Sequence, residues 1–167
     1  MMRLAIVSFL AIVAACATTP DDTPGLRYAD AASRGAWAQL LAGRPSAAQV
    51  DRATLNWSNA LRESFACGLP MRDVLNAGLA GALEIAAMNA AASGGGEREV
   101  REGVGRYVVE LAGMAVERRE RPSSARCDTL AAWAPRTAAD GRETVERARR
   151  NGLMEDDYGL LLGLLGR

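Results

Sequence analysis

Apolar residues in this chain recur at intervals of three and four, and a convincing alternation of apolar and polar residues is found nowhere. The segment from Val50 to Phe65 is the clearest case, because Trp57 and Leu61 fall on the same side of a helix as its two ends. Strand side chains instead alternate between two faces, so this spacing does not suit a strand. The pattern predicts an all-α fold, a compact bundle of about five or six helices in one domain.

Glycine, proline and capping residues divide the sequence into the predicted helices. Ser46 and Gln49 form a capping box, in which each side chain satisfies a backbone N–H of the other residue. Pro70 suits the first turn of a helix, and Pro135 is expected to separate two helices. The predicted helices span residues 28–42, 46–67, 70–92, 97–121, 124–133 and 137–151, and a last apolar stretch spans residues 158–167.

The charged residues exclude several classes of function. The chain has 20 Lys plus Arg against 20 Asp plus Glu, and all the cations are arginines. Balanced charge argues against nucleic acid as the main partner. Without His or Lys, the chain has no imidazole for a Ser-His-Asp triad or a metal site, and no amine for a Schiff base. We therefore predict no catalytic residues, no metal site and no cofactor, and we do not expect an enzyme.

The first sixteen residues differ in character from the rest. A positive start at Arg3 precedes an apolar run from Leu4 to Val13, which is interrupted only by Ser8. This run falls well short of the ~20 residues that a membrane-spanning helix needs, so it is typical of a signal peptide. Small residues then lead directly to Cys16. The alternatives are an ordinary secretory signal with a stray cysteine, or an apolar N-terminal helix.

Val13-Ala14-Ala15-Cys16 resembles the lipobox of bacterial lipoproteins, in which an aliphatic residue and two small residues precede a cysteine. In that family a diacylglycerol is joined to the cysteine sulfur and the signal is cut before it, so the resemblance makes Cys16 the lipid attachment site. Ala17 stands where an aspartate would resemble the inner-membrane retention signal, which implies the periplasmic face of the outer membrane of a Gram-negative bacterium. The implied division is a signal peptide at 1–15, a lipidated tether at 16–25 and a helical domain at 26–167.

Lipidation would leave two cysteines, Cys67 and Cys127, in a compartment where disulfides form and persist. We predict that these two residues form a disulfide, and two separate buried thiols are the alternative. Closing a loop of about sixty residues would constrain the unfolded chain by ~4 kcal/mol in the loop-entropy model.

Two acidic features can be interpreted either as functional sites or as structural residues. The functional alternative is catalysis for the first and metal binding for the second. Glu63-Ser64 resembles the Glu-Ser pair of lytic transglycosylases, but in that family the following Gly-Leu segment comes after a wider interval than residues 68–69 do here. A solvated charge on a helix surface is therefore favoured for Glu63. Glu155-Asp156-Asp157 lacks the spacing of a calcium loop, and these carboxylates more plausibly begin the last helix, where negative charge is favourable.

Two further clusters bear on partners. An arginine cluster could face lipid headgroups or an acidic partner surface, although ordinary solvated cations are favoured. A leucine cluster near the C-terminal end is expected to be buried, with an exposed partner site as the alternative. The first cluster is Arg118, Arg119, Arg121 and Arg126, and the second is Leu160, Leu161, Leu162, Leu164 and Leu165.

The sequence as a whole favours a binding role. We expect a membrane-anchored lipoprotein that faces the periplasm and docks on a partner protein of the envelope, similar in plan to the pilotins that escort secretin subunits. The alternatives are a peptidoglycan-cleaving enzyme that uses Glu63 or another carboxylate, and a structural lipoprotein that ties the membrane to the wall. The expected partners are the membrane, through the N-terminal lipid, and a protein, with neither nucleic acid nor a small-molecule cofactor.

Overall fold

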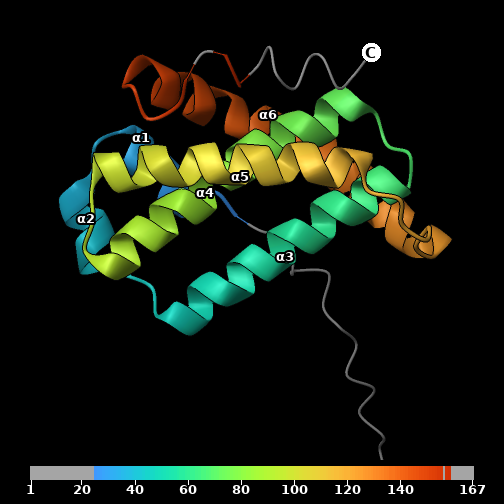
Figure 1. Cartoon of the computed structure of the whole chain (residues 1–167), viewed down its shortest axis with the longest axis horizontal. Coiled ribbons are helices and arrows are strands. Elements are labelled where there is room, and N and C mark those ends of the chain that lie inside the picture. The colour runs from blue at the N-terminus through green and yellow to red at the C-terminus, as the bar shows by residue number, and fades with distance from the viewer. Residues whose placement is uncertain (1–24, 156, 159–167) are drawn as a thin grey trace, which may run out of the picture.

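The fold is built around one apolar helix, α4 (Met71–Ser93), in a computed structural model that describes residues 25–155 and 157–158. The long helices α3 (Ala47–Ala66), α5 (Glu97–Val116) and α6 (Ser124–Arg150) pack against α4 (Figure 1). The short helices α1 (Arg27–Ser33) and α2 (Trp37–Ala42) lie beside its C-terminal half. These six helices, all the regular structure in the described residues, confirm the predicted all-α bundle.

Helix α4 is central because its neighbours cover it on nearly every side. Its buried residues run almost without a break from Val74 to Ala91, and most of them are Ala, Gly or Leu. Among the described helices, α4 alone is long and apolar enough to cross a membrane, but 89% of that apolar stretch is buried inside the bundle. A helix that is apolar all round is expected at the centre of a bundle.

Glycines on α4 bring large side chains close to its backbone. A Cβ atom on Gly81 would lie 2.4 Å from Cε3 of Trp57, and one on Gly78 would lie 2.6 Å from the methyl carbons of Leu111. Trp57 on α3 also packs edge to face against Trp133 on α6, with 5.6 Å between ring centroids. The absence of a side chain at positions 78 and 81 therefore sets how closely α3 and α5 approach α4.

The first predicted helix, residues 28–42, is two helices in the structure, so the prediction of one continuous helix was wrong. Gly35 has a φ of 67° and ends α1 in the left-handed conformation that glycine tolerates best. Its N–H donates to the carbonyl of Ala32, and the N–H of Ala36 donates to the carbonyl of Ala31. These two bonds form a Schellman motif, which turns the chain before α2 begins.

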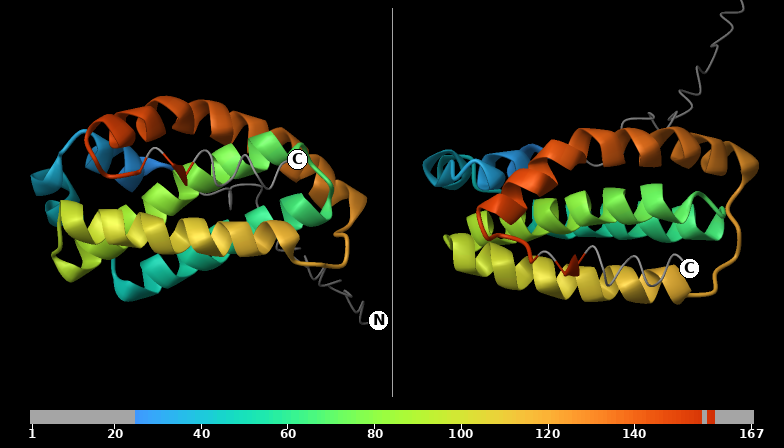
Figure 2. Two further views of the ribbon diagram at one scale, coloured as in Figure 1. Left: turned by 45° about the horizontal axis from the view of Figure 1, so that its top comes forward. Right: turned by 90° about the horizontal axis from the view of Figure 1, so that it is seen from above.

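Helix α6 corrects the prediction of two helices separated at Pro135, because it runs without a break through that proline. Pro135 and Ala131, whose carbonyl loses its usual donor, both face solvent, so water can satisfy that carbonyl. The side chain of Arg136 donates to the neighbouring carbonyl of Ala132 at 2.8 Å. Figure 2 shows α6 as an arch over the bundle, as expected for a helix bent at proline. Thr137, the first residue of the helix predicted over residues 137–151, is buried inside α6.

Helix α5 ends at Val116, earlier than the predicted residue 121. Met114 is its last buried residue, and residues 116–121 are all exposed, so a longer helix would bury no further apolar surface. The arginines of residues 118–121 therefore lie in the segment between α5 and α6, and not in the last turn of a helix as predicted. The N-terminal end of α5 is capped by Glu99, whose carboxylate accepts a hydrogen bond from the N–H of Gly96 at 2.8 Å.

Two predicted local features of α3 are present. Ser46 and Gln49 form the expected capping box at its start, with the N–H of Ser46 donating to Oε1 of Gln49 at 2.8 Å. At its end, Cys67 forms a disulfide with Cys127 in the first turn of α6, and their Cα atoms lie 5.6 Å apart. Both cysteines are buried, so the bond joins the end of α3 to the start of α6 inside the core.

Substitution of Gly81 by alanine tests the close approach of Trp57 to α4. We expect Gly81→Ala to lower the free energy of unfolding by roughly 1–3 kcal/mol, because the buried indole has no room to move away from the new methyl group. Gly113→Ala is the matched control, since position 113 lies in α5 with open space around it and should gain about 1 kcal/mol in helix propensity. Chemical denaturation of both variants measures the difference, and equal stabilities would contradict the packing described here.

Candidate functional site

A cavity of about 310 Å³ lies between the start of α1, the first half of α3 and the second half of α4. This volume is at the lower end of the ~300–1,000 Å³ that small-molecule sites occupy in proteins. Each of the three helices contributes both polar and apolar groups to its lining. The residues that matter for its chemistry are Arg27, Arg52, Asn56, Trp57, Glu84 and Met88.

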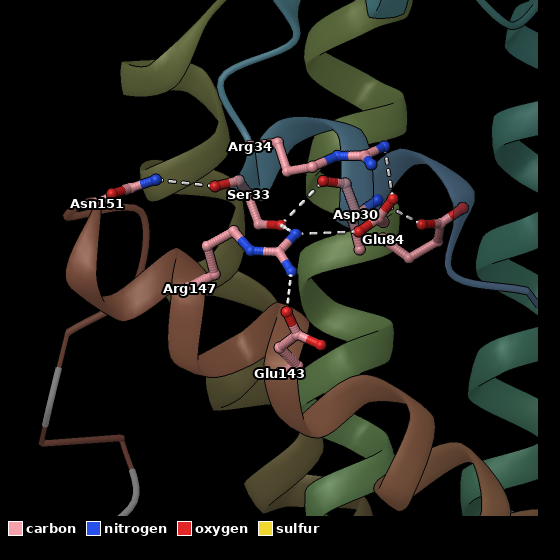
Figure 3. A network of polar contacts seen from close by, with 8 residues as sticks. Asp30, Ser33, Arg34, Glu84, Glu143, Arg147 and Asn151 are labelled. Carbon is pink, nitrogen blue, oxygen red and sulfur yellow. Dashed lines mark hydrogen bonds and ion pairs between the residues drawn. The ribbon is translucent and has the colours of Figure 1, made fainter.

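Glu84 is the buried charge of this cavity. It belongs to α4, and only 4% of its surface is exposed. Its Oε2 atom accepts a hydrogen bond from the backbone N–H of Ala29 at 2.6 Å (Figure 3). The residue before α1 is Leu26, which has no polar side-chain group with which to cap the helix. Glu84 therefore supplies from α4 the cap that the sequence of α1 itself does not provide.

Burial raises the pKa of Glu84 from 4.5 to about 7. Removal of the carboxylate from water is the largest cause, because burial disfavours the charged form. Hydrogen bonds from the backbone N–H groups of Ala29 and Tyr28 act in the opposite direction, as does the positive charge of Arg27, whereas Asp30 adds to the increase. A carboxyl group with this pKa can accept or release a proton close to neutral pH.

The other end of α1 is held by α6 (Figure 3). Arg147 donates to Oδ1 of Asp30 at 3.1 Å, and it also pairs with Glu143 on its own helix. Asn151, at the end of α6, donates to the carbonyl of Ser33 at 2.8 Å. Polar side chains of α4 and α6 therefore fix the position of α1, and with it one wall of the cavity.

The predicted site residues are distributed elsewhere. Glu63 lies on α3, and its Oε2 atom forms a surface ion pair with Nε of Arg126 on α6 at 2.7 Å. Within the described residues, which include Glu155 and Asp157, no group of three metal-binding side chains comes together. Cys16, Asp156 and the leucine cluster of residues 160–165 lie outside the described part of the chain, so their predicted roles stay predictions.

Sequence reasoning missed Glu84, although the sequence contains a signal for it. Glu84 is the one charged residue between Asp73 and Glu97, in a stretch dominated by alanine, glycine and leucine. A lone carboxylate in the middle of the most apolar helix predicts a buried charge with a specific partner. The identity of that partner was not predictable, because Ala29 contributes only a backbone N–H, which no sequence pattern marks.

Comparison with protein-family models, curated proteins and solved structures found no match for this chain. The function is therefore inferred from the residues of the chain itself.

The pKa of Glu84 predicts a pH dependence of stability. Because this carboxyl binds its proton more tightly when folded than when unfolded, its contribution to the free energy of unfolding is largest below pH 4.5 and is lost as the pH rises through about 7. The total change is about 3 kcal/mol, at 1.36 kcal/mol for each unit of pKa. Glu84→Gln keeps a neutral group of similar shape and should remove this dependence.

Chemical denaturation of the wild type and of Glu84→Gln, from acid to neutral pH, gives the free energy of unfolding of each protein. The difference between the two at each pH measures the contribution of Glu84. Glu102→Gln removes an exposed carboxyl group on α5 and controls for the substitution itself. Glu99 does not interfere: the hydrogen bond from the N–H of Gly96 lowers its pKa to about 2, so its contribution is lost only in more acidic solution. A constant difference between wild type and Glu84→Gln would show that folding does not raise the pKa of Glu84.

Proposed function

We propose that this chain is a bacterial lipoprotein, anchored through lipid on Cys16 to the periplasmic face of the outer membrane, whose helical domain binds a partner protein of the envelope. Its plan is similar to that of the pilotins. The observation that carries the proposal is the combination of the lipobox-like sequence 13–16 with the disulfide between Cys67 and Cys127. Disulfides persist in the periplasm and are rare in the cytosol, so the two features favour the same side of the membrane.

The position of α1 is consistent with a domain held close to the lipid. Helix α1 begins at Arg27, so the predicted tether, residues 16–25, is all that separates the lipid from the first helix apart from Leu26. Such a segment spans at most ~35 Å when fully extended. A domain on a tether of that length would meet partners that lie at or near the membrane surface.

The surface of α3 and α5 supports a docking role. The exposed large hydrophobic side chains in residues 25–155 are Leu55 on α3, and Val109 and Val116 on α5. These two helices also contact each other directly. Apolar side chains on the surface of a soluble domain gain free energy when a partner covers them. The exposed faces of α3 and α5 that carry Leu55, Val109 and Val116 form the region that we propose for partner docking.

Replacement of Cys16 tests the anchor. We expect Cys16→Ser to lose the lipid and either to leave the membrane fraction or to keep its signal peptide uncleaved, because serine cannot carry the diacylglycerol through a thioether. The two acyl chains anchor the protein by ~0.8 kcal/mol for each buried methylene. Fractionation of cells and incorporation of labelled palmitate measure the result. Ala17→Ser is the matched control at the adjacent position and should remain in the membrane. Unchanged fractionation and labelling of Cys16→Ser would contradict lipidation at this residue.

Site-specific crosslinking tests the docking surface. A photo-reactive amino acid in place of Val109 should form an adduct with an envelope protein in living cells, because Val109 projects from α5 with 73% of its surface exposed. The matched control is the same amino acid in place of Arg142, which is exposed on α6. Mass spectrometry of the adducts identifies the partner. Adducts of the same kind from both positions, or none from position 109, would argue against docking through α3 and α5.

A further inference from the structure

We propose that the cavity between α1, α3 and α4 binds a small zwitterion with an apolar body, such as a dipeptide, with the amino group toward Glu84 and the carboxylate toward Arg27 and Arg52. This inference goes beyond docking of a partner protein and does not depend on the lipid anchor, because every residue it uses lies in the helical domain.

Glu84 defines the end of the cavity that takes the amino group. Its carboxylate accepts hydrogen bonds from the N–H groups of Ala29 and Tyr28, but a carboxylate has about four acceptor positions, so acceptor capacity remains. Because the group is 4% exposed, few water molecules compete for that capacity. An ammonium group offers three N–H donors and a positive charge, and it would compensate the buried carboxylate better than a neutral donor can.

The cavity lining also carries positive charge. Arg27 and Arg52 are both exposed and come from different helices, α1 and α3. Guanidinium groups bind carboxylates with two parallel hydrogen bonds, and two arginines in the lining of one cavity favour an anion there. These arginines would repel a simple amine, and Glu84 would repel a simple carboxylate. Only a ligand with both charges complements both the carboxylate of Glu84 and the two arginines.

Apolar side chains make up another part of the cavity lining. Trp57 and Met88 are buried side chains that line the cavity from α3 and α4, and Ala53 leaves space where a larger residue would fill it. Asn56 adds one amide group, which can donate to or accept from a peptide unit. The volume of about 310 Å³ suits a ligand of roughly dipeptide size.

Leucyl-leucine and two derivatives with one end blocked test this assignment. Isothermal titration of the full chain in detergent, at a pH of about 8 so that Glu84 is ionised, measures binding of the free dipeptide, its N-acetyl form and its C-terminal amide. We expect the free dipeptide to bind, and each blocked form to bind roughly tenfold to a hundredfold more weakly, as loss of one charge-assisted hydrogen bond predicts. Absence of binding by the free dipeptide at millimolar concentration, or equal binding of all three, would overturn the proposal.

Three variants separate recognition from folding. Glu84→Gln should abolish the preference for the free over the acetylated amino end, and Arg52→Gln should reduce the preference for the free over the amidated carboxyl end. Ala53→Trp should fill the cavity and prevent binding without a change of charge. Arg142→Gln, an exposed arginine of α6, is the control and should bind like wild type. Circular dichroism confirms that each variant is folded, and a folded Glu84→Gln that keeps the wild-type preference contradicts the proposal.

Discussion

The close approach of neighbouring helices to α4 is the constraint on which the rest of the structure depends. Because α4 presents glycine and alanine at the points of contact, the indole of Trp57 and the side chain of Leu111 lie directly against its backbone. Little apolar volume is needed to fill so narrow a space, and a domain of this size can then form a dense core with few aromatic residues. The disulfide adds a covalent link between two of the covering helices, at the end of the bundle where α3 stops and α6 starts.

A single carboxylate interrupts this apolar centre. Glu84 is tolerated there because it satisfies a backbone N–H of α1 that would otherwise be unpaired, and because its raised pKa lets it take up a proton at little cost near neutral pH. The same residue that joins α1 to α4 thus leaves a polar group at the base of a cavity. Glu84 is therefore both a structural contact and a candidate ligand-binding group.

The helical class, the capping box of α3 and the pairing of the cysteines were predictable, because each depends on residue spacing or on simple counting. The break at Gly35 was not, since glycine is compatible with a helix until the residues that follow it must turn. The prediction of a break at Pro135 was wrong for the opposite reason. Proline removes one hydrogen bond, but α6 gains more free energy by burying Leu130, Trp133 and Ala134 on one continuous face. The cavity was also not predictable, because α1, α3 and α4 meet there only through tertiary packing.

The attachment of α1 has a mechanical consequence. Any pull on the chain before Arg27 reaches the domain first through α1, whose seven residues are held by hydrogen bonds to Glu84, Arg147 and Asn151. Helix α1 adds only the small side chains of Ala29, Ala31 and Ala32 to the core. The remaining helices are joined by a disulfide and by the larger core side chains, so they resist the same load more strongly. Under tension α1 would detach before the bundle opens, and α3 to α6 would stay folded.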